Sequence, residues 1–292
     1  MTSAGELRSG KGHRDENFPV ASYLVHPRYR APILAFYEFV RVADDIADHA
    51  ELAPDRKLAL LDRLEASLLG ASTADPEGVR LRIALAERGL STRHAQDLLD
   101  AFRLDVTKLR YANWDELMDY CSLSAMPVGR YVLDVHGEDR STWPASDAIC
   151  GALQIINHLQ DCKLDYLNLD RVYVPLDAMA AAGTGVEALG APHATPELLT
   201  CLHKLAERTG GLLREGYSLP DQIKNLRLSL EISVIYTLAE RLVRTLMARD
   251  PLRDKVHHKS LGFAGVGLVG IFKGLARRTL RRSASSAEHQ GA

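Results

Sequence analysis

The sequence predicts an all-α protein. Apolar residues recur at the three- and four-residue spacing of helices along most of the 292 residues. Alternating strand patterns and the Asn-Gly or Asp-Gly turns of hairpins are nearly absent. No internal repeat or linker divides the chain, so we expect one helical domain over residues 1–292. Within it, we expect residues 1–16 to form a flexible tail and residues 260–292 a distinct apolar and basic segment.

Capping residues place the helices of the first half. Proline is common in the first turn of a helix and glycine just after the last turn, whereas Ser and Asn are good N-caps. The expected helices run from about Tyr29 to His49, from near Pro54 to Gly70, onward from Pro76, from Ser91 through Phe102, and from Asn113 through Leu123. We expect Pro127 and Gly129 to kink the last of these helices.

The second half begins with a long apolar segment that opens after Trp143-Pro144. We expect one helix from Ser146 to about Leu169 and a surface loop over residues 183–196, which are rich in glycine and proline. Two long helices are expected near 197–217 and 221–249. Asp250-Pro251 should stop the second, because the residue before proline disfavours the helical conformation.

Composition and motifs exclude several classes of function. The formal net charge is −2, so no excess of positive charge points to nucleic acid. The four cysteines form no CxxC pair and are expected to be free thiols. The N-terminus lacks the apolar run of a secretory signal, so we expect a cytoplasmic protein. There is no GxSxG, HExxH, P-loop or GxGxxG motif, and no nicotinamide cofactor is expected.

Carboxylates interrupt the apolar stripe of the first helix. The run RVADDIADHA places Arg41, Asp44, Asp45 and Asp48 within one and a half turns. Asp44 and Asp48 share a helix face and occupy positions where core residues should continue. Burying them without partners would be costly, and Mg²⁺ would offset that cost because it prefers carboxylate oxygens and bridges to phosphates. The alternative is a helix that ends in a solvated acidic face.

A polar stripe also runs along the long helix that follows Pro144. Its members are spaced by three or four residues and are Gln154, Asn157, Asp161, Asp165 and Asn168. Apolar residues surround the stripe, which fits a helix that is buried on most sides and shows one polar line to a cavity. The alternative is an ordinary amphipathic helix whose polar line faces water. We interpret His158, beside the stripe, as a residue that packs or hydrogen-bonds locally.

The two clusters together suggest one chemistry. If their helices pack antiparallel across a cavity, the carboxylates face each other. Magnesium ions held between them could bind a diphosphate and stabilise its developing negative charge. Ionisation of such a leaving group needs no nucleophilic side chain, in agreement with the lack of nucleophile motifs.

At this point the motifs resemble a known family. The segments DDIAD and NHLQDCKLDY, followed by RVYVP at Arg171 to Pro175, are similar to the squalene/phytoene synthase family over about residues 11–250. The segment with Asp105, Arg110 and Tyr111 looks like a further family segment. Within the family, the opening SGKGHRDENFPVAS and the NHLQDC segment look like the bacterial enzymes that make hydroxysqualene for hopanoid pathways.

The resemblance implies a fold and a reaction. The fold would be a terpenoid synthase fold with a central apolar cavity. The reaction would be the ionisation of presqualene diphosphate with Mg²⁺ as cofactor, rearrangement of the cation and capture by water. Two rivals remain: head-to-head condensation of prenyl diphosphates, giving presqualene diphosphate, dehydrosqualene or phytoene, and a non-catalytic helical lipid-binding or assembly protein.

The resemblance also assigns residues. Asp44, Asp48, Asp161 and Asp165 would hold magnesium and support catalysis, with Asp45 and Asn157 as neighbouring or additional ligands. Arg41 and Gln154 would contact the diphosphate or orient those ligands, and Arg171 and Tyr173 would close the phosphate end. The candidate wall residues for the hydrocarbon are Phe18, Ser22, Leu123, Met126 and Val128.

The sequence departs from the family at one place. Relatives often carry a second aromatic residue and then Val-Ala-Gly after their Tyr-Cys pair. Here Tyr120-Cys121 is followed by Ser-Leu-Ser-Ala, and Met126 stands at the glycine. We therefore do not transfer a tyrosine-centred role from other members. The hypothesis is a reshaped cavity that suits a different substrate or a cation quenched by water.

The C-terminal segment allows two interpretations. Residues Ser260 to Arg282 are apolar and glycine-rich and then basic, which is typical of a segment lying at an anionic membrane surface. In that case the protein would be peripheral at the inner face of the membrane. The alternative is a C-terminal helix that closes the core.

Overall fold

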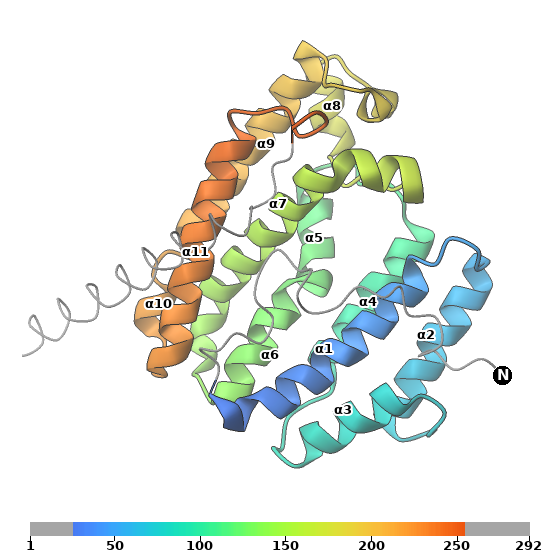
Figure 1. Ribbon diagram of the computed structural model, residues 1–292, viewed down its shortest axis with the longest axis vertical. Coiled ribbons are helices and arrows are strands. Elements are labelled where there is room, and N and C mark those ends of the chain that lie inside the picture. Colours follow the sequence, from blue (N-terminus) through green and yellow to red (C-terminus); the bar gives the residue numbers. More distant parts are fainter. Residues whose placement is uncertain (1–25, 255–292) are drawn as a thin grey trace, which may run out of the picture.

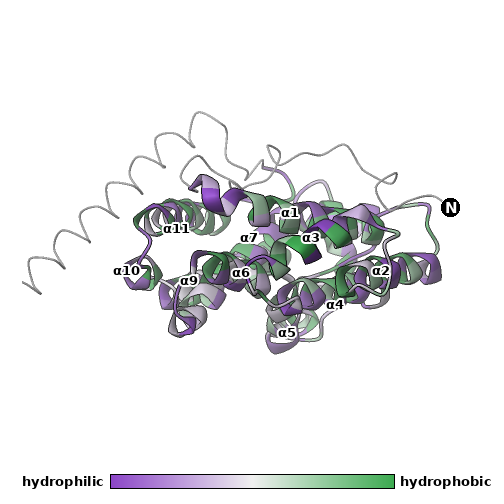
Figure 2. Ribbon diagram, turned by 90° about the horizontal axis from the view of Figure 1, so that it is seen from below, coloured by the Kyte–Doolittle hydropathy of each residue, from purple (hydrophilic) through white to green (hydrophobic). Residues whose placement is uncertain are grey.

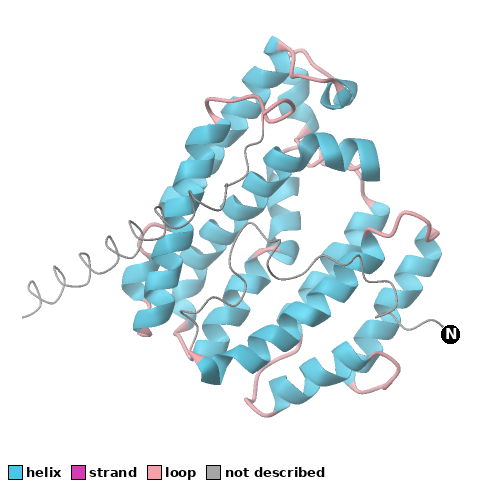
Figure 3. Cartoon of the chain, viewed as in Figure 1, coloured by secondary structure: helices cyan, strands magenta, loops and turns pink. Residues whose placement is uncertain are grey.

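The computed structural model describes residues 26–254, and these residues form helices and no strands. The α-helices are α1 (Pro27–Ala47), α2 (Pro54–Leu69), α3 (Pro76–Ala86), α4 (Arg93–Thr107), α5 (Trp114–Ser124), α6 (Met126–His136), α7 (Trp143–Leu169), α8 (Leu176–Ala181), α9 (Pro196–Glu215), α10 (Leu219–Gln222) and α11 (Leu226–Leu246). Short 3₁₀ helices η2 (Arg140–Thr142) and η3 (Val186–Gly190) complete the described part (Figure 3). The predicted all-α class is confirmed.

The long helices surround the middle of the molecule. Figure 1 shows α1 to α4 on one side, α9 and α11 on the other, and α5, α6 and α7 between them. In the end-on view of Figure 2, α1 and α11 lie along one side and α4, α5 and α9 along the opposite side. The buried side chains form two clusters, and α4 and α6 contribute residues to both, so the helices share a continuous interior.

Most helix ends follow the capping residues. Pro54 and Pro76 open α2 and α3, and Gly70 ends α2 in the left-handed conformation, with φ 87°. The side chain of Asn113 accepts a hydrogen bond from the backbone N–H of Glu116 at 2.9 Å, as expected of an N-cap. The predicted starts of these helices are confirmed.

The kink expected near Pro127 is instead a complete break. Ala125, with φ −123° and ψ −44°, separates α5 from α6. Pro127 has no N–H to continue the hydrogen-bond ladder, so the chain starts a new helix. A Cβ on Gly129 would lie 2.5 Å from Ser146 and Cys150, so glycine lets α6 approach α7 closely.

Other boundaries also differ from the sequence expectations. The fourth helix starts at Arg93 with Thr92 at the N-cap position, although the hydroxyl of Ser91, the expected cap, accepts a hydrogen bond from the backbone N–H of Arg93 at 3.1 Å. The long helix starts at Trp143 rather than Ser146. The expected helix 221–249 is divided, because residues 223–225 leave the helical conformation between α10 and α11. The predicted surface loop contains η3.

Contacts with α6 hold α1 in place. The hydroxyl of Tyr131 donates a hydrogen bond of 2.8 Å to the carbonyl of Pro32, and the rings of Phe36 and Tyr131 stack with centroids 3.9 Å apart. Both residues of the stack are buried. This anchor fixes the direction of α1 and thereby the position of the aspartates near its C-terminal end.

Candidate active site

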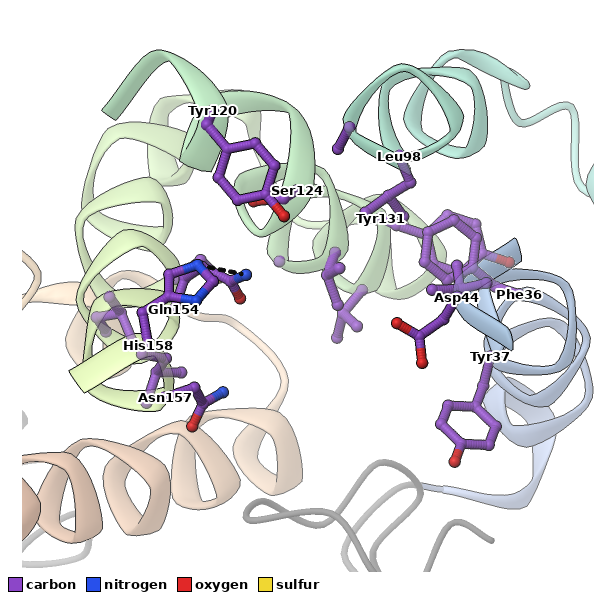
Figure 4. A pocket seen from close by; sticks show the side chains of 18 of the residues that line it. Phe36, Tyr37, Asp44, Leu98, Tyr120, Ser124, Tyr131, Gln154, Asn157 and His158 are labelled. Atoms are coloured by element: carbon purple, nitrogen blue, oxygen red, sulfur yellow. Dashed lines mark hydrogen bonds between the residues drawn. The ribbon is translucent and has the colours of Figure 1, made fainter. Parts of the chain in front are cut away.

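A cavity of about 570 Å³ lies between α1, α4, α5, α6, α7 and α11. Figure 4 shows it from close by, with Tyr37 and Asp44 of α1 facing Gln154, Asn157 and His158 of α7. Its lining is mainly apolar and includes Ile33, Phe36, Val40, Leu98, Phe102, Leu133, Ile149, Leu153, Leu228 and Ile232. An interior of this kind suits a hydrocarbon ligand.

The cavity is polar where α1 and α7 end. Along α1 the lining changes from Ile33 to Asp48, and along α7 it changes from Ile149 to Asp165. Figure 1 shows that the two helices run in the same direction. The two clusters therefore meet through parallel helices and not through the antiparallel pair that we considered from the sequence.

The first cluster divides into two parts. Asp44 and Asp48 line the cavity, whereas Asp45 is 8% exposed and is not among the lining residues. Arg41 joins both parts, because its guanidinium donates to Asp44 at 2.8 Å and to Asp45 at 3.0 Å. Burial and then the charge of Asp48 together raise the pKa of Asp44 to about 7, against the opposing effect of Arg41. Arg41 thus orients Asp44, the aspartate of this pair that faces the cavity.

The second cluster lies on the opposite wall. Four members of the predicted polar stripe line the cavity, namely Gln154, Asn157, Asp161 and Asp165, whereas the fifth, Asn168, is exposed and does not. Burial, followed by the charges of Asp161 and then of Asp48, raises the pKa of Asp165 to about 7. Because Asp48 is the C-cap of α1, the two clusters are close enough to interact electrostatically across the cavity.

These carboxylates fit magnesium shared with a diphosphate better than a closed protein cage. Within residues 26–254, no group of three or more His, Cys, Asp or Glu residues is close enough to hold one metal ion. The donor set nevertheless consists of carboxylate and amide oxygens, which are ligands that Mg²⁺ prefers. Burial and neighbouring carboxylates raise the pKa values of Asp44 and Asp165, so a cation at this place would stabilise their charged forms. Mg²⁺ usually takes one or two carboxylates and completes its shell with water and phosphate.

Arg171 ties the end of α1 to the segment after α7. Its guanidinium donates to Oδ1 of Asp48 at 2.5 Å, to the carbonyl of Ala47 at 3.1 Å and to the carbonyl of Asp105 at 3.0 Å. Asp170 ends α7 with φ 51°, and this turn directs Arg171 back under the cavity. Arg171 is 6% exposed, so it acts as a buried support for a metal-ligand candidate.

Beside Arg171 lies a buried carboxylate, Asp105, which was named from the sequence only as part of a family segment and without a role in the site. Asp105 of α4 accepts hydrogen bonds from the hydroxyls of Tyr173 at 2.7 Å and Tyr120 at 2.9 Å. Burial raises the pKa of Asp105 to about 6, although Arg171 and the two tyrosines oppose the shift. Asp105, Tyr120 and Tyr173 all line the cavity. No local spacing links them, because the bonded pairs are 15 and 68 residues apart.

His158 packs as the sequence interpretation proposed. Its ring stacks on Tyr173 with centroids 3.6 Å apart, and its Nε2 lies 3.1 Å from Nε2 of Gln154. Burial, together with the charge of Arg171, lowers the pKa of His158 to about 3, so the ring is neutral. A neutral ring accepts the hydrogen bond that the Gln154 amide donates, and this bond fixes Gln154 against the cavity wall.

The candidate wall residues have different outcomes. Val128 lines the cavity, whereas Phe18 and Ser22 lie outside the described residues. Leu123 and Met126 are not among the lining residues and pack instead against the core. The terminal methyl of Met126 lies beside Gly151, together with Met118 and Leu212. The break at Ala125 turns Met126 toward α7 and α9, so the structure does not bring it into the cavity as we expected.

The described chain contains no helix of the length and apolarity that crossing a membrane requires. The C-terminal segment 260–292 and the tail 1–16 lie outside the described residues, so both interpretations of the C-terminal segment stay predictions.

Comparisons with known proteins agree with the geometry. The family model for squalene/phytoene synthase matches residues 12–261. The chain is 59% identical to a hydroxysqualene synthase of Rhodopseudomonas palustris, over 97% of this chain and 96% of the relative. It is 55% identical to a hydroxysqualene synthase of Sinorhizobium fredii, over 97% of each chain.

Solved structures show the same fold. The crystal structure of squalene synthase HpnC from Alicyclobacillus acidocaldarius matches with a TM-score of 0.71 and 30% identity, covering 83% of this chain and 91% of that one. A dehydrosqualene synthase solved with a ligand matches with a TM-score of 0.77 at 19% identity, over 91% and 94% of the two chains. The chain therefore has the all-α terpenoid synthase fold and belongs to the squalene/phytoene synthase family.

Proposed function

We propose that the protein is a hydroxysqualene synthase that converts presqualene diphosphate and water to hydroxysqualene and diphosphate. The observation that carries the proposal is one cavity with apolar walls and carboxylates of two helices at a single end. Support also comes from relatives named hydroxysqualene synthase that are 59%, 55% and 48% identical over almost the whole chain. The apolar part accommodates the C30 hydrocarbon and the acidic end receives the diphosphate.

The residues at the acidic end divide into metal ligands and residues that position the ligands or the diphosphate. Asp44, Asp48, Asp161 and Asp165 hold Mg²⁺, with Asn157 as an additional oxygen ligand. Bound Mg²⁺ would supply charge stabilisation for the departing diphosphate. Gln154 orients the diphosphate, and Arg41 and Arg171 position the carboxylates that they contact. Asp45 is a supplementary ligand in the proposal, and its side chain accepts a hydrogen bond from Arg41.

The apolar walls have the second role. After the C–O bond of the diphosphate ester breaks, the electron pair leaves with the diphosphate and the hydrocarbon carries a positive charge. The walls contributed by Phe36, Ile149 and Ile232 exclude bulk water while the carbon skeleton rearranges. Aromatic rings at the cavity, among them Tyr120, stabilise a cation through their π faces.

A turnover assay with product mass tests the proposal. Purified full-length protein is incubated with presqualene diphosphate or with farnesyl diphosphate, each with and without MgCl₂. We expect a C30 alcohol from presqualene diphosphate only, and only with magnesium. Condensation products from farnesyl diphosphate would instead assign the protein to prenyl diphosphate coupling. Ligand binding without turnover would favour a lipid-binding or assembly protein.

The acidic residues provide the matched control. Asp161→Asn should lower turnover at least about 100-fold, since it removes a candidate metal ligand. Asp55→Asn changes an exposed aspartate on α2 and should leave turnover unchanged. Equal activity of wild type and Asp161→Asn would refute the assigned role of that carboxylate.

Membrane association is a separate proposal. We propose that residues 260–292 hold the protein at the inner face of the membrane, which would bring the site near its long hydrocarbon substrate and product. The support is the apolar and then basic sequence of that segment. Flotation with anionic liposomes should decrease when the chain is truncated after Lys259. Equal flotation of both proteins would refute the proposal.

A further inference from the structure

We propose that the hydroxyl of Ser124 holds the water molecule that captures the carbocation. Ser124 is the last residue of α5 and lines the cavity. Its Oγ is buried and has no hydrogen-bond partner among residues 26–254. Buried hydroxyls rarely lack a partner, and where no protein group is near, an ordered water commonly fills that role. The inference rests on the proposed function, because it concerns the water that this reaction consumes.

The orientation of Ser124 differs from that of other helical hydroxyls in this chain. Serine and threonine within helices commonly bond back to the carbonyl four residues earlier. The hydroxyls of Ser67, Thr107, Thr200, Thr209, Ser233, Thr237 and Thr245 all do so. Ser124 makes no such bond to Tyr120. Its hydroxyl is therefore free to donate to and accept from a group within the cavity.

Other polar groups lie on the same wall. Figure 4 shows Ser124 and Tyr120 of α5 together with Gln154 and His158 of α7, on the side opposite Asp44 and Tyr37. A buried water needs two to four polar partners. Ser124 supplies a donor and an acceptor, and the amide of Gln154, held by His158 at 3.1 Å, supplies a second polar group.

The hydroxyl of Tyr120 already has a partner, because it donates a hydrogen bond to Asp105 at 2.9 Å. Tyr120 lies one helical turn before Ser124 on the same face of α5. Ser124 is consequently the position on α5 where a hydroxyl remains available to a cavity water. The wall on which it lies is opposite Asp44 of α1, so a water there does not compete with that carboxylate.

The chemical step balances without an oxidant or reductant. A lone pair of the water oxygen forms a C–O bond with the cationic carbon of the rearranged hydrocarbon. The resulting oxonium loses one proton to the released diphosphate, and the neutral alcohol remains. If no water is held at that place, the cation instead loses a proton from a neighbouring carbon and gives an unsaturated C30 hydrocarbon. The ratio of alcohol to hydrocarbon therefore reports on the position of the water.

The experiment measures that ratio for wild type and three full-length variants with presqualene diphosphate and MgCl₂. Ser124→Ala removes the hydroxyl, and Ser124→Val also fills the space of the water. Ser122→Ala is the matched control, since the hydroxyl of Ser122 on the same helix already donates to the carbonyl of Asp119 at 2.6 Å. Urea unfolding of each variant measures stability independently of the product.

We expect the ratio of alcohol to hydrocarbon to fall at least fivefold in Ser124→Ala and further in Ser124→Val. The Ser122→Ala control should keep the wild-type ratio. A wild-type ratio in both Ser124 variants, whatever their rate or stability, would overturn the inference and leave the proposed function intact. If wild type itself makes no alcohol, the proposed function fails, and the inference fails with it.

Discussion

Arg171 donates a hydrogen bond to Asp48 at 2.5 Å, and this contact joins residues that are 123 positions apart in the chain. Arg171 is buried, whereas the Asp48 side chain is 41% exposed at the cavity. The same guanidinium donates to the carbonyls of Ala47 and Asp105. One side chain therefore fixes the end of α1, the end of α4 and a candidate metal ligand relative to one another.

Replacement of Arg171 by methionine should damage both stability and activity. The change leaves two buried carbonyls and one carboxylate without their donor. Loss of the Arg171 donor should lower the free energy of unfolding by about 2–4 kcal/mol. This loss is smaller than for a fully buried ion pair because Asp48 is partly exposed. Urea unfolding should show this loss, and turnover at saturating substrate should fall at least about 100-fold.

The surface pair of Arg110 and Asp170 provides the control. Asp170 is 66% exposed in this ion pair, so Arg110→Met should cost no more than about 1 kcal/mol. An Arg171→Met variant as stable and as active as Arg110→Met would contradict the supporting role that the three contacts assign to Arg171.

Magnesium with inorganic diphosphate should stabilise the wild-type protein, because a ligand that binds only the folded state raises the free energy of unfolding. At 100 times its dissociation constant the gain is about 2.7 kcal/mol, or roughly 5–10 °C in Tm. Asp165→Asn should change Tm in two ways. Without metal it should raise Tm, since burial disfavours the charged carboxylate, and it should abolish most of the rise with magnesium and diphosphate.

Differential scanning calorimetry measures both effects at pH 8. Asp55→Asn serves as the control and should keep the wild-type rise. A full rise in Asp165→Asn would remove Asp165 from the magnesium site, whatever the activity of that variant.

Met126 should influence stability and not the product. Its side chain packs beside Gly151 of α7 and is absent from the cavity lining. Met126→Ala should therefore cost about 1–2 kcal/mol, less than a fully buried site because the residue is only half-buried, and should keep the wild-type product pattern. Leu153→Ala is the matched comparison, since Leu153 is also half-buried but lines the cavity.

Product analysis by mass spectrometry distinguishes the two sites. We expect new by-products from Leu153→Ala and none from Met126→Ala. The reverse result would restore the hypothesis, drawn from the sequence, that Met126 shapes the cavity.

The fold was predictable because it depends on local signals. Pro54, Gly70 and Asn113 fix helix ends through contacts within a few residues, and the helical period of apolar residues identifies the buried faces. The break at Ala125 was missed because a proline near a helix end allows either a kink or a new start. The close approach of Gly129 to α7 decides between them, and that contact is tertiary.

The carboxylates of the site were predictable where polar residues recur at helical spacing among apolar ones. Asp44 and Asp161 meet that condition, and both line the cavity. Asp45 does not line it, because one residue further along a helix turns the side chain by about 100° toward Arg41. Asp105 was named only as part of a family segment, and its place in the site could not be predicted because its tyrosine partners lie far away in the sequence.

The stability of an Asp105→Asn variant relative to wild type should increase with pH. In the folded protein the pKa of Asp105 is raised from 3.8 to about 6, so folding favours the protonated acid. The contribution of Asp105 to the free energy of unfolding is fully present below pH 4. It is lost as the pH rises through 6, because over this range the unfolded state binds fewer protons than the folded state. Asparagine cannot ionise, so the Asp105→Asn variant does not lose this stability as the pH rises.

The free-energy difference between Asp105→Asn and wild type should accordingly shift in favour of the variant by up to about 3 kcal/mol between pH 4 and pH 7. Urea unfolding at five pH values in that range measures it. Asp100→Asn, at a half-exposed aspartate on the same helix, is measured beside it, and the pH-dependent shift should be larger at the buried Asp105. A flat difference for Asp105→Asn would mean that Arg171 and the two tyrosines fully offset the burial of this carboxylate.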